Sequence, residues 1–248
     1  RPGFEHIASW RPLTVLSLRL DAAVAPLDAS HYRVVNAIWH AFIVGLLTLF
    51  LGALTSSRWT AVLLGCVVAI HPVFSEAVAS IVGRGDLLAS FWGLLGLVVA
   101  LTPRLRDAQG SPIAALICVA FAMLSKETGV VYAVTLGAIW FRQGRLLCAV
   151  WLSGLIAVWF ALRLSVVGGL GGEVSELDNP MVTLSSTDYL VTGLGVVGRY
   201  MLYTLVPQHI AADHAAGVAF GWTDSVMGLV TLSGAIFALT KLLLRPPS

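Results

Sequence analysis

The residues most able to do chemistry are a few charged side chains that lie beside or within long apolar segments. Arg84 stands between two glycines. Lys126 is followed by Glu127, and Arg199 interrupts an apolar run. Guanidinium and ammonium groups bind phosphate through charge-assisted hydrogen bonds, and neighbouring glycines let backbone N–H groups turn toward the same anion. We therefore predict contacts with a phosphate, or positions in a polar cavity, for Arg11, Arg84, Lys126 and Arg199.

A second set of residues carries acidic, amide or imidazole groups. His71 and Glu76 flank Pro72, which removes a backbone donor and must kink or end a helix there. Pro72 and Glu76 are four residues apart and so share a helix face. Such groups can shape a polar cavity or contact a sugar or an acceptor, a role predicted for His71, Glu76, Asp86, Glu127, Asp178 and Asn179. We predict no metal site among them.

Several of these residues also have simpler structural explanations. Asp86 is a natural N-cap for a helix that begins at the next residue. Ser125 would cap the helix that follows it, with Glu127 favourably placed in its first turn. Asp178 and Asn179 stand before a proline and suit a turn. Both kinds of explanation stay open for these positions.

The composition shows the medium in which these residues must work. Of 248 residues, 11% are charged and 58% are hydrophobic, and a soluble domain carries about 25% charged residues. The mean hydropathy of +0.88 gives more apolar surface than one globular core could hide. The net charge of +2 does not favour nucleic-acid binding. Lipid is therefore the expected partner, and the three cysteines are expected to be buried hydrophobes within apolar runs.

The apolar segments predict an all-α, polytopic membrane helix bundle with about seven to eight embedded helices. The segment Pro112–Phe141 is long for one span and short for two, so we predict two short helices that meet at residues 125–127. The other stretches without charged residues, apart from Arg199 in one of them, are Val34–Ser57, Trp59–Ser75, Leu87–Pro103, Leu146–Leu162, Tyr189–Val206 and Ser225–Thr240.

Flanking arginines orient the bundle, because basic loops favour the cytoplasm. The loops at Arg58, at residues 104–106 and at residues 142–145 are assigned to that side. Residues 1–30, 80–86, 124–128 and 167–188 then lie on the opposite side. We divide the chain into a non-cytoplasmic segment 1–30 and a helix bundle 31–248 with an acidic loop at 167–188. The number of crossings in 189–248 stays open.

A helix lying in the membrane interface is predicted after Trp10. Its apolar positions share one face at helical spacing, and they are Leu13, Leu16, Leu20 and Val24. Such a helix would hold Arg11 at the level of the lipid headgroups, and the alternative is a solvated arginine. The cations on the non-cytoplasmic side would then suit an anionic, lipid-linked substrate with its phosphate at the interface.

Six short motifs, taken in order, resemble those of the transmembrane-and-tetratricopeptide-repeat O-mannosyltransferases. Each motif is weak alone, but their number, order and spacing make the combination specific. The match covers most of the chain, including Arg199 and the acidic residue Asp213 that follow the last motif. The motifs are residues 10–20, 31–36, 71–78, 82–88, 125–129 and 178–180.

The resemblance implies a GT-C-type glycosyltransferase that transfers a sugar with inversion. The expected donor is a polyprenyl- or dolichyl-phosphate sugar, with mannose as the sugar, and the acceptor is a Ser or Thr hydroxyl of a protein. No further cofactor and no divalent metal are implied. The site would face the periplasm in a bacterial inner membrane or the lumen in an endoplasmic-reticulum membrane.

The sequence departs from that family at one important position. In such enzymes an acidic residue just after the first span acts as the base. Neither that span nor an acidic motif precedes Arg1 in this sequence. We do not transfer that role to Glu5 or Glu76, so the catalytic base stays unassigned. The expectation is a piece of a longer enzyme, without its first span and its repeats, that is inactive alone.

Two other functions remain compatible with the residues. A transporter or flippase for a lipid-linked or anionic substrate would also keep charges inside a membrane. It should place polar residues in both halves of the bilayer, whereas here they gather on one side. A non-catalytic scaffold of the same fold is the other alternative.

Overall fold

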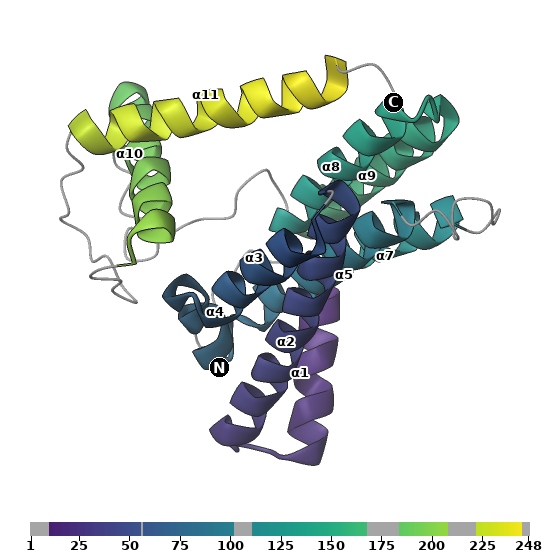
Figure 1. The fold of residues 1–248 in the computed structure, drawn as a ribbon. Coiled ribbons are helices and arrows are strands. Elements are labelled where there is room, and N and C mark those ends of the chain that lie inside the picture. The colour runs from purple at the N-terminus through teal and green to yellow at the C-terminus, as the bar shows by residue number, and fades with distance from the viewer. Residues whose placement is uncertain (1–9, 56, 102–110, 168–183, 208–221, 245–248) are drawn as a thin grey trace. The chain divides into compact units, whose positions relative to one another are not determined.

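The computed structural model describes residues 10–55, 57–101, 111–167, 184–207 and 222–244. These residues contain helices and no strand, so the predicted all-α fold is confirmed. The chain divides into two compact units. One comprises residues 10–166, and the other contains residues 167–248. Each unit is described by itself below (Figure 1).

The first unit contains most of the helices and two short 3-10 turns, Pro72–Phe74 and Glu127–Gly129. Its α-helices are α1 (Pro12–Val24), α2 (Ala29–Leu54), α3 (Arg58–Ile70), α4 (Ser75–Ala79), α5 (Arg84–Leu101), α7 (Ser111–Ser125), α8 (Val130–Arg142) and α9 (Leu146–Val167). The second unit contains α10 (Ser186–Leu205) and α11 (Trp222–Leu244).

Three helices, α2, α5 and α9, are each long and apolar enough to cross a membrane. A fourth span is possible if α3 and the segment Pro72–Ala79 form one bent element, with a bend of 51°. The break falls at Pro72, where the sequence predicts a kinked or ended helix. The pair of short helices predicted within Pro112–Phe141 is also found, as α7 and α8.

Helix α5 lies at the centre of the first unit. Within its most apolar stretch 56% of the residues are buried inside the protein, against 6% for α2 and 11% for α9. On one side α5 meets α7 and α8 in a cluster that includes Leu97, Val119 and Trp140. On the other it meets α2 through a cluster around Ile43. Helix α5 is therefore enclosed by protein, and α2 and α9 leave most of their surface to lipid.

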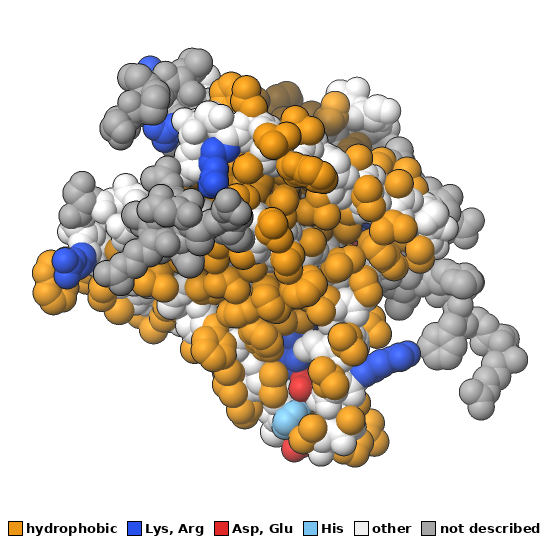
Figure 2. Space-filling view, turned by 90° about the vertical axis from the view of Figure 1, so that its right-hand side faces the viewer, with side chains coloured by type: hydrophobic (Ala, Val, Ile, Leu, Met, Phe, Trp, Pro, Cys, Tyr) orange, Lys and Arg blue, Asp and Glu red, His pale blue; other side chains and the backbone are white. Residues whose placement is uncertain are grey.

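The outer surface of the helices is apolar. Trp59, Leu63 and Ile70 on α3 are all exposed, and so are Leu147 and Trp151 on α9. Figure 2 shows such side chains spread over much of one face of the molecule. In water a surface of this kind would drive aggregation, but in a bilayer it is the expected boundary with lipid tails.

Glycines allow two of the tightest helix contacts. In the second unit, a Cβ on Gly198 or Gly228 would overlap the backbone of the partner helix, so α10 and α11 cross closely there. In the first unit, a Cβ on Gly129 would overlap the backbone of Ala122 in α7. Gly129 therefore sets how closely the turn after α7 folds back on that helix.

Gly129→Ala should lower the stability of the protein in detergent by about 1–3 kcal/mol, because the added methyl group meets backbone that cannot move aside. Thermal unfolding midpoints measure the effect. Gly154→Ala is the matched control, since nothing lies within 4 Å of a Cβ at Gly154 in α9. Equal midpoints for the two variants would contradict the close contact at Gly129.

Candidate functional site

Polar residues occupy the inner face of α1. Arg11, Thr14, Ser17 and Asp21 follow one another at intervals of three or four residues, which places them on one side of the helix. Thr14 is buried, and its hydroxyl donates a 2.6 Å hydrogen bond to the carbonyl oxygen of Ser125. Three of the predicted apolar positions are exposed, namely Leu16, Leu20 and Val24. The amphipathic helix thus turns its polar face to the protein and its apolar face outward.

Glu127 joins two arginines that are far apart in the sequence. Its Oε2 lies 3.0 Å from Nη2 of Arg11 at the start of α1. Its Oε1 accepts a 2.7 Å hydrogen bond from Nη1 of Arg163 on α9. Arg163 also lies over the ring of Trp159, whose indole N–H donates to the carbonyl oxygen of Met123. One carboxylate therefore holds α1, the turn after α7 and α9 together.

Lys126 pairs with Asp86 rather than with the adjacent Glu127. The distance from Nζ of Lys126 to Oδ2 of Asp86 is 2.6 Å. The sequence pattern left an external anion or a carboxylate open for Lys126, and the structure supplies the carboxylate. A Cβ at Gly85 would lie 3.5 Å from Thr14 Oγ1 and 3.8 Å from Lys126 Cδ. Helices α1 and α5 and the end of α7 meet at this glycine.

Arg84 is the most enclosed charge in the described part of the chain, with 0% of the residue exposed. Its Nη2 donates to Oδ2 of Asp21 at 2.6 Å, and its Nη1 donates to Oγ of Ser17 at 2.7 Å. Its Nε donates to Oδ1 of Asn36 at 2.5 Å. The anion predicted for Arg84 is thus an internal carboxylate, and a guanidinium buried in this way has no surface for an external phosphate.

Asn36 extends this network to the segment before α5. Its amide nitrogen donates to the carbonyl oxygens of Val78 and Ser80 at 3.2 and 2.8 Å. On the other side of the network, His31 Nε2 lies 3.6 Å from Oδ1 of Asp21. Hydrogen bonds therefore connect α2, the start of α5 and the end of α4, in addition to the apolar cluster around Ile43.

These contacts come from neighbouring segments of the first unit, and we call their residues the polar strip. It contains four cations and three carboxylates, so with neutral histidine it carries one excess positive charge. Arg11, Lys126 and Arg163 keep 28%, 24% and 18% of their side chains exposed, and Arg84 keeps 1%. Its residues are Arg11, Thr14, Ser17, Asp21, Asn36, Arg84, Asp86, Lys126, Glu127 and Arg163.

Glu127 is held in its charged form. Burial acts to raise the pKa of its carboxyl group, but hydrogen bonds from its own backbone N–H and from Arg11 and Arg163 act in the opposite direction and prevail. The pKa of Glu127 therefore lies below its usual value. The ion pairs of Glu127 with Arg11 and Arg163 therefore persist at neutral pH.

Two capping predictions were wrong. Helix α5 begins at Arg84, so Asp86 lies in its first turn and is not its N-cap. Ser125 ends α7, and its hydroxyl donates back to the carbonyl oxygen of Phe121 instead of capping the next helix. The side chain of Asp86 instead forms an ion pair with Lys126, and the hydroxyl of Ser125 bonds within its own helix.

His71 and Glu76 lie in the segment around the bend at Pro72. Nδ1 of His71 accepts a hydrogen bond from the backbone N–H of Val73 and so caps the 3-10 turn at Pro72. Glu76 is exposed in the first turn of α4. Both residues lie in the bent segment that Asn36 connects to α2.

Arg199 belongs to the second unit. Its Nη2 donates to Oδ2 of Asp224 at 2.6 Å, which joins α10 to α11. The sequence pattern required an anion for Arg199, and within the described residues Asp224 is that anion. Asp178 and Asn179, together with Asp213, lie outside the described residues.

Sequence reasoning missed four of the residues that complete these ion pairs and hydrogen bonds. Arg163 was hidden because it directly follows the apolar run that ends at Leu162, so it was read as the end of a span. Asp21 could have been found from its spacing to Arg11, since ten residues place both on one helix face. Asn36 and Asp224 gave no signal, because their partners come from distant segments.

Comparison with known proteins identifies relatives at the level of sequence. The chain is 39% identical to mouse protein O-mannosyl-transferase TMTC2 over 127 residues, which are 49% of this chain and 15% of that protein. It is 31% identical to Drosophila protein O-mannosyl-transferase Tmtc1 over 194 residues, 73% of this chain and 23% of that protein. For Drosophila protein O-mannosyl-transferase Tmtc2 the identity is 31% over 223 residues, 83% of this chain and 24% of that protein.

The chain therefore spans at most about a quarter of the length of these three relatives. No family model matches it, and no solved structure matches it. The Drosophila matches extend over most of the chain.

The ion pairs of Glu127 should make the protein sensitive to acid. Because the pKa of Glu127 is lowered on folding, its contribution to stability is present above its unfolded pKa of about 4.3 and is lost as the pH falls through the lower folded value. At pH 7 the thermal midpoint of the wild type should exceed that of Glu127→Gln by a few degrees. The gap should close below about pH 4.

Thermal unfolding of both proteins in detergent between pH 7 and pH 3 measures this gap. Glu76→Gln is the control, since Glu76 is exposed and forms no ion pair within the described residues. A gap for Glu127→Gln that stays constant over this range would contradict the assignment.

Proposed function

We propose that this chain forms part of a membrane enzyme that transfers mannose to proteins, because it belongs to the TMTC-type protein O-mannosyl-transferase family. The proposed acceptor is a Ser or Thr hydroxyl of a protein. The proposed donor is mannose linked to a polyprenyl or dolichyl phosphate. The enzyme would lie in a bacterial inner membrane or in the endoplasmic-reticulum membrane, with its site on the non-cytoplasmic side.

One observation carries the choice of a lipid-linked donor. Arg11, Lys126 and Arg163 come from three separate segments and gather, partly exposed, in a unit whose helices present many apolar side chains at their surface. Charges persist in such surroundings only if they are paired or functional. The carboxylates leave one excess positive charge in the strip, which suits an anion. A lipid-linked sugar phosphate has an anionic group next to a hydrocarbon chain, so it fits both parts of this surface.

The reaction we propose is a single displacement at the anomeric carbon. The acceptor oxygen forms a bond to C1 of the mannose, and the bond from C1 to the phosphate oxygen breaks with its electron pair leaving on the phosphate. The acceptor proton passes to a base, which we assign to none of the described residues. Attack opposite the leaving group inverts the configuration. Cations already in place beside the phosphate stabilise the negative charge that develops there.

Predicted residues and Arg163, which the structure adds to them, divide between these roles. We propose Arg11, Lys126 and Arg163 as the phosphate contacts, with Glu127 and Asp86 orienting them. His71 and Glu76, beside the bend at Pro72, are proposed to shape the cavity or contact the sugar or the acceptor. The protein's own cations supply the positive charge that the leaving phosphate requires, so the proposal includes no metal and no further cofactor.

Lys126→Ala in the full-length protein should reduce mannosyl transfer from a polyprenyl-phosphate mannose donor by about tenfold to a hundredfold. A hydrogen bond to a charged group contributes about 1.5–3 kcal/mol, and 1.4 kcal/mol corresponds to tenfold. The measurement is transfer of radiolabelled mannose to an acceptor peptide in proteoliposomes.

Arg58→Ala is the matched control. Arg58 is an exposed cation at the start of α3, just after the end of α2. Asn36 lies about 18 residues before that end of α2, which corresponds to about 27 Å of helix. This variant should transfer mannose at the parental rate. Transfer at the parental rate by Lys126→Ala and by Arg11→Ala would remove the phosphate-contact assignment.

A further inference from the structure

Helix α1 is held to the protein by polar contacts rather than by an apolar core. Of its residues only Thr14 is buried, and its apolar side chains Leu16, Leu20 and Val24 are exposed. Trp10, just before the helix, packs against the main apolar cluster, but none of the residues 11–24 does so. The orientation of α1 beyond Trp10 therefore depends on the hydrogen bonds and ion pairs of its inner face.

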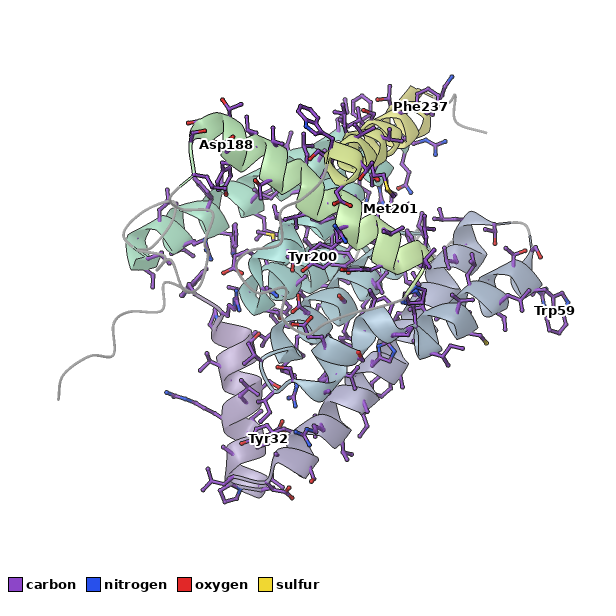
Figure 3. The ribbon with its side chains drawn as sticks, turned by 90° about the vertical axis from the view of Figure 1, so that its left-hand side faces the viewer. Tyr32, Trp59, Asp188, Tyr200, Met201 and Phe237 are labelled. Carbon is purple, nitrogen blue, oxygen red and sulfur yellow. The ribbon has the colours of Figure 1, made fainter. Side chains whose placement is uncertain are left out.

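Arg84 provides two of those contacts and joins them to α2. From its place at the start of α5 it donates to Ser17 and Asp21 on α1 and to Asn36 on α2. The backbone carbonyl oxygen of Tyr32 on α2 lies a further 3.4 Å from its Nη2. In Figure 3 the label of Tyr32 marks this corner, where the side chains of α1 and α2 face each other. One buried guanidinium thus links three helices.

The geometry of a helix connects this corner to the exposed cations. Arg11 directly precedes α1, about 15 Å along the helix axis from Asp21. Fixing Asp21 against Arg84 and Thr14 against Ser125 leaves α1 no freedom to rotate about its axis, so the direction of Arg11 is set. Arg84 also lies two residues before Asp86, the carboxylate that holds Lys126.

We propose that Arg84 is a positioning residue: through Asp21 and Asn36 it fixes α1 and the start of α5, so that Arg11 and Lys126 face the donor phosphate. The role in donor binding rests on the proposed function. The placement of α1 by Arg84 does not, and it is measurable without any substrate.

The chemistry of the corner requires an arginine. The planar guanidinium presents its N–H donors in a fixed fork, and Arg84 uses Nε, Nη1 and Nη2 toward acceptors in different directions. A lysine ammonium at the same position is a point charge on a flexible stem and cannot reach all three acceptors at once. Arg84→Lys should therefore keep the charge and lose the placement of α1.

Disulfide cross-linking measures that placement directly. Thr14→Cys and Gly85→Cys, in a protein with Cys66, Cys118 and Cys148 replaced by alanine, should cross-link readily, because a Cβ at Gly85 meets Thr14 Oγ1 at an ordinary contact distance. Adding Arg84→Lys or Asp21→Asn should lower the cross-linking rate at least fivefold. Asp21→Asn keeps one acceptor oxygen for Arg84 and is the milder second variant if Arg84→Lys does not fold.

Asp188→Asn is the matched control for the carboxylate change. Asp188 lies in the first turn of α10, in the second unit. Its carboxylate accepts a hydrogen bond from the Ser185 hydroxyl, and its backbone N–H donates to the same hydroxyl oxygen. This variant should cross-link at the parental rate. Cross-linking of Arg84→Lys and Asp21→Asn at the parental rate would overturn the placement of α1 by Arg84.

Steady-state kinetics of the full-length enzyme separate positioning from simple loss of folded protein. A destabilised enzyme has fewer active molecules, which lowers kcat and leaves the donor KM unchanged. A misplaced Arg11 weakens donor binding, so Asp21→Asn should raise the donor KM about tenfold with kcat changed less than twofold. Slower cross-linking with an unchanged donor KM would overturn the link between Arg84 and the donor.

One further comparison tells this result apart from failure of the proposed function. If Lys126→Ala and Arg11→Ala also leave the donor KM unchanged, the strip does not bind the donor phosphate and the proposed function fails. If those two variants raise the donor KM and Asp21→Asn does not, only the positioning role of Arg84 fails.

Discussion

A charge in a lipid-embedded bundle must find a partner, and this constraint decides which helices of the protein meet. Arg84 has no exposed surface and is matched by Asp21, Ser17 and Asn36. A buried pair that loses one partner costs about 3–5 kcal/mol, whereas a buried pair adds little over well-packed apolar groups. The value of these pairs thus lies in specificity: an alternative packing of the helices would leave charges unmatched. Apolar packing alone is less selective, since lipid tails satisfy the same surfaces equally well.

The partners in these pairs are distant in the sequence. Arg11 and Glu127 are 116 residues apart, and Arg84 and Asp21 are 63 residues apart. Each pair joins a helix that exposes apolar side chains outward to a segment near the centre of the unit. The same pattern recurs in the second unit, where Arg199 and Asp224 join α10 and α11 beside glycines that let the two backbones approach. Polar contacts choose the partner helix, and small residues allow the close distance.

The helices were predictable from the sequence, but the partners of the charges were not. Apolar runs marked the long helices, and Pro72 marked the bend, because both depend on local chemistry. Asp86 and Ser125 were expected to cap helices. Asp86 instead forms an ion pair with Lys126, and the hydroxyl of Ser125 donates a hydrogen bond to a carbonyl oxygen of its own helix. Local preference is worth about 1 kcal/mol at a cap, and a tertiary ion pair in a low dielectric outweighs it. Arg84 shows the same limit, since the sequence indicated that it needs an anion but not that the anion is Asp21.

The long separation between Arg11 and Glu127 also has a consequence for synthesis. At about 5–20 residues per second, a ribosome needs roughly 6 to 23 s to make the 116 residues that separate them. During that time α1 is already present. Arg84 is missing for part of the interval and Glu127 for all of it, so neither holds α1 from the start. Helix α1 is therefore made well before the two residues that hold its inner face. Until then its outward leucines face the chaperones or membrane components around the growing chain. Quality-control factors therefore have access to an unfinished molecule during this interval.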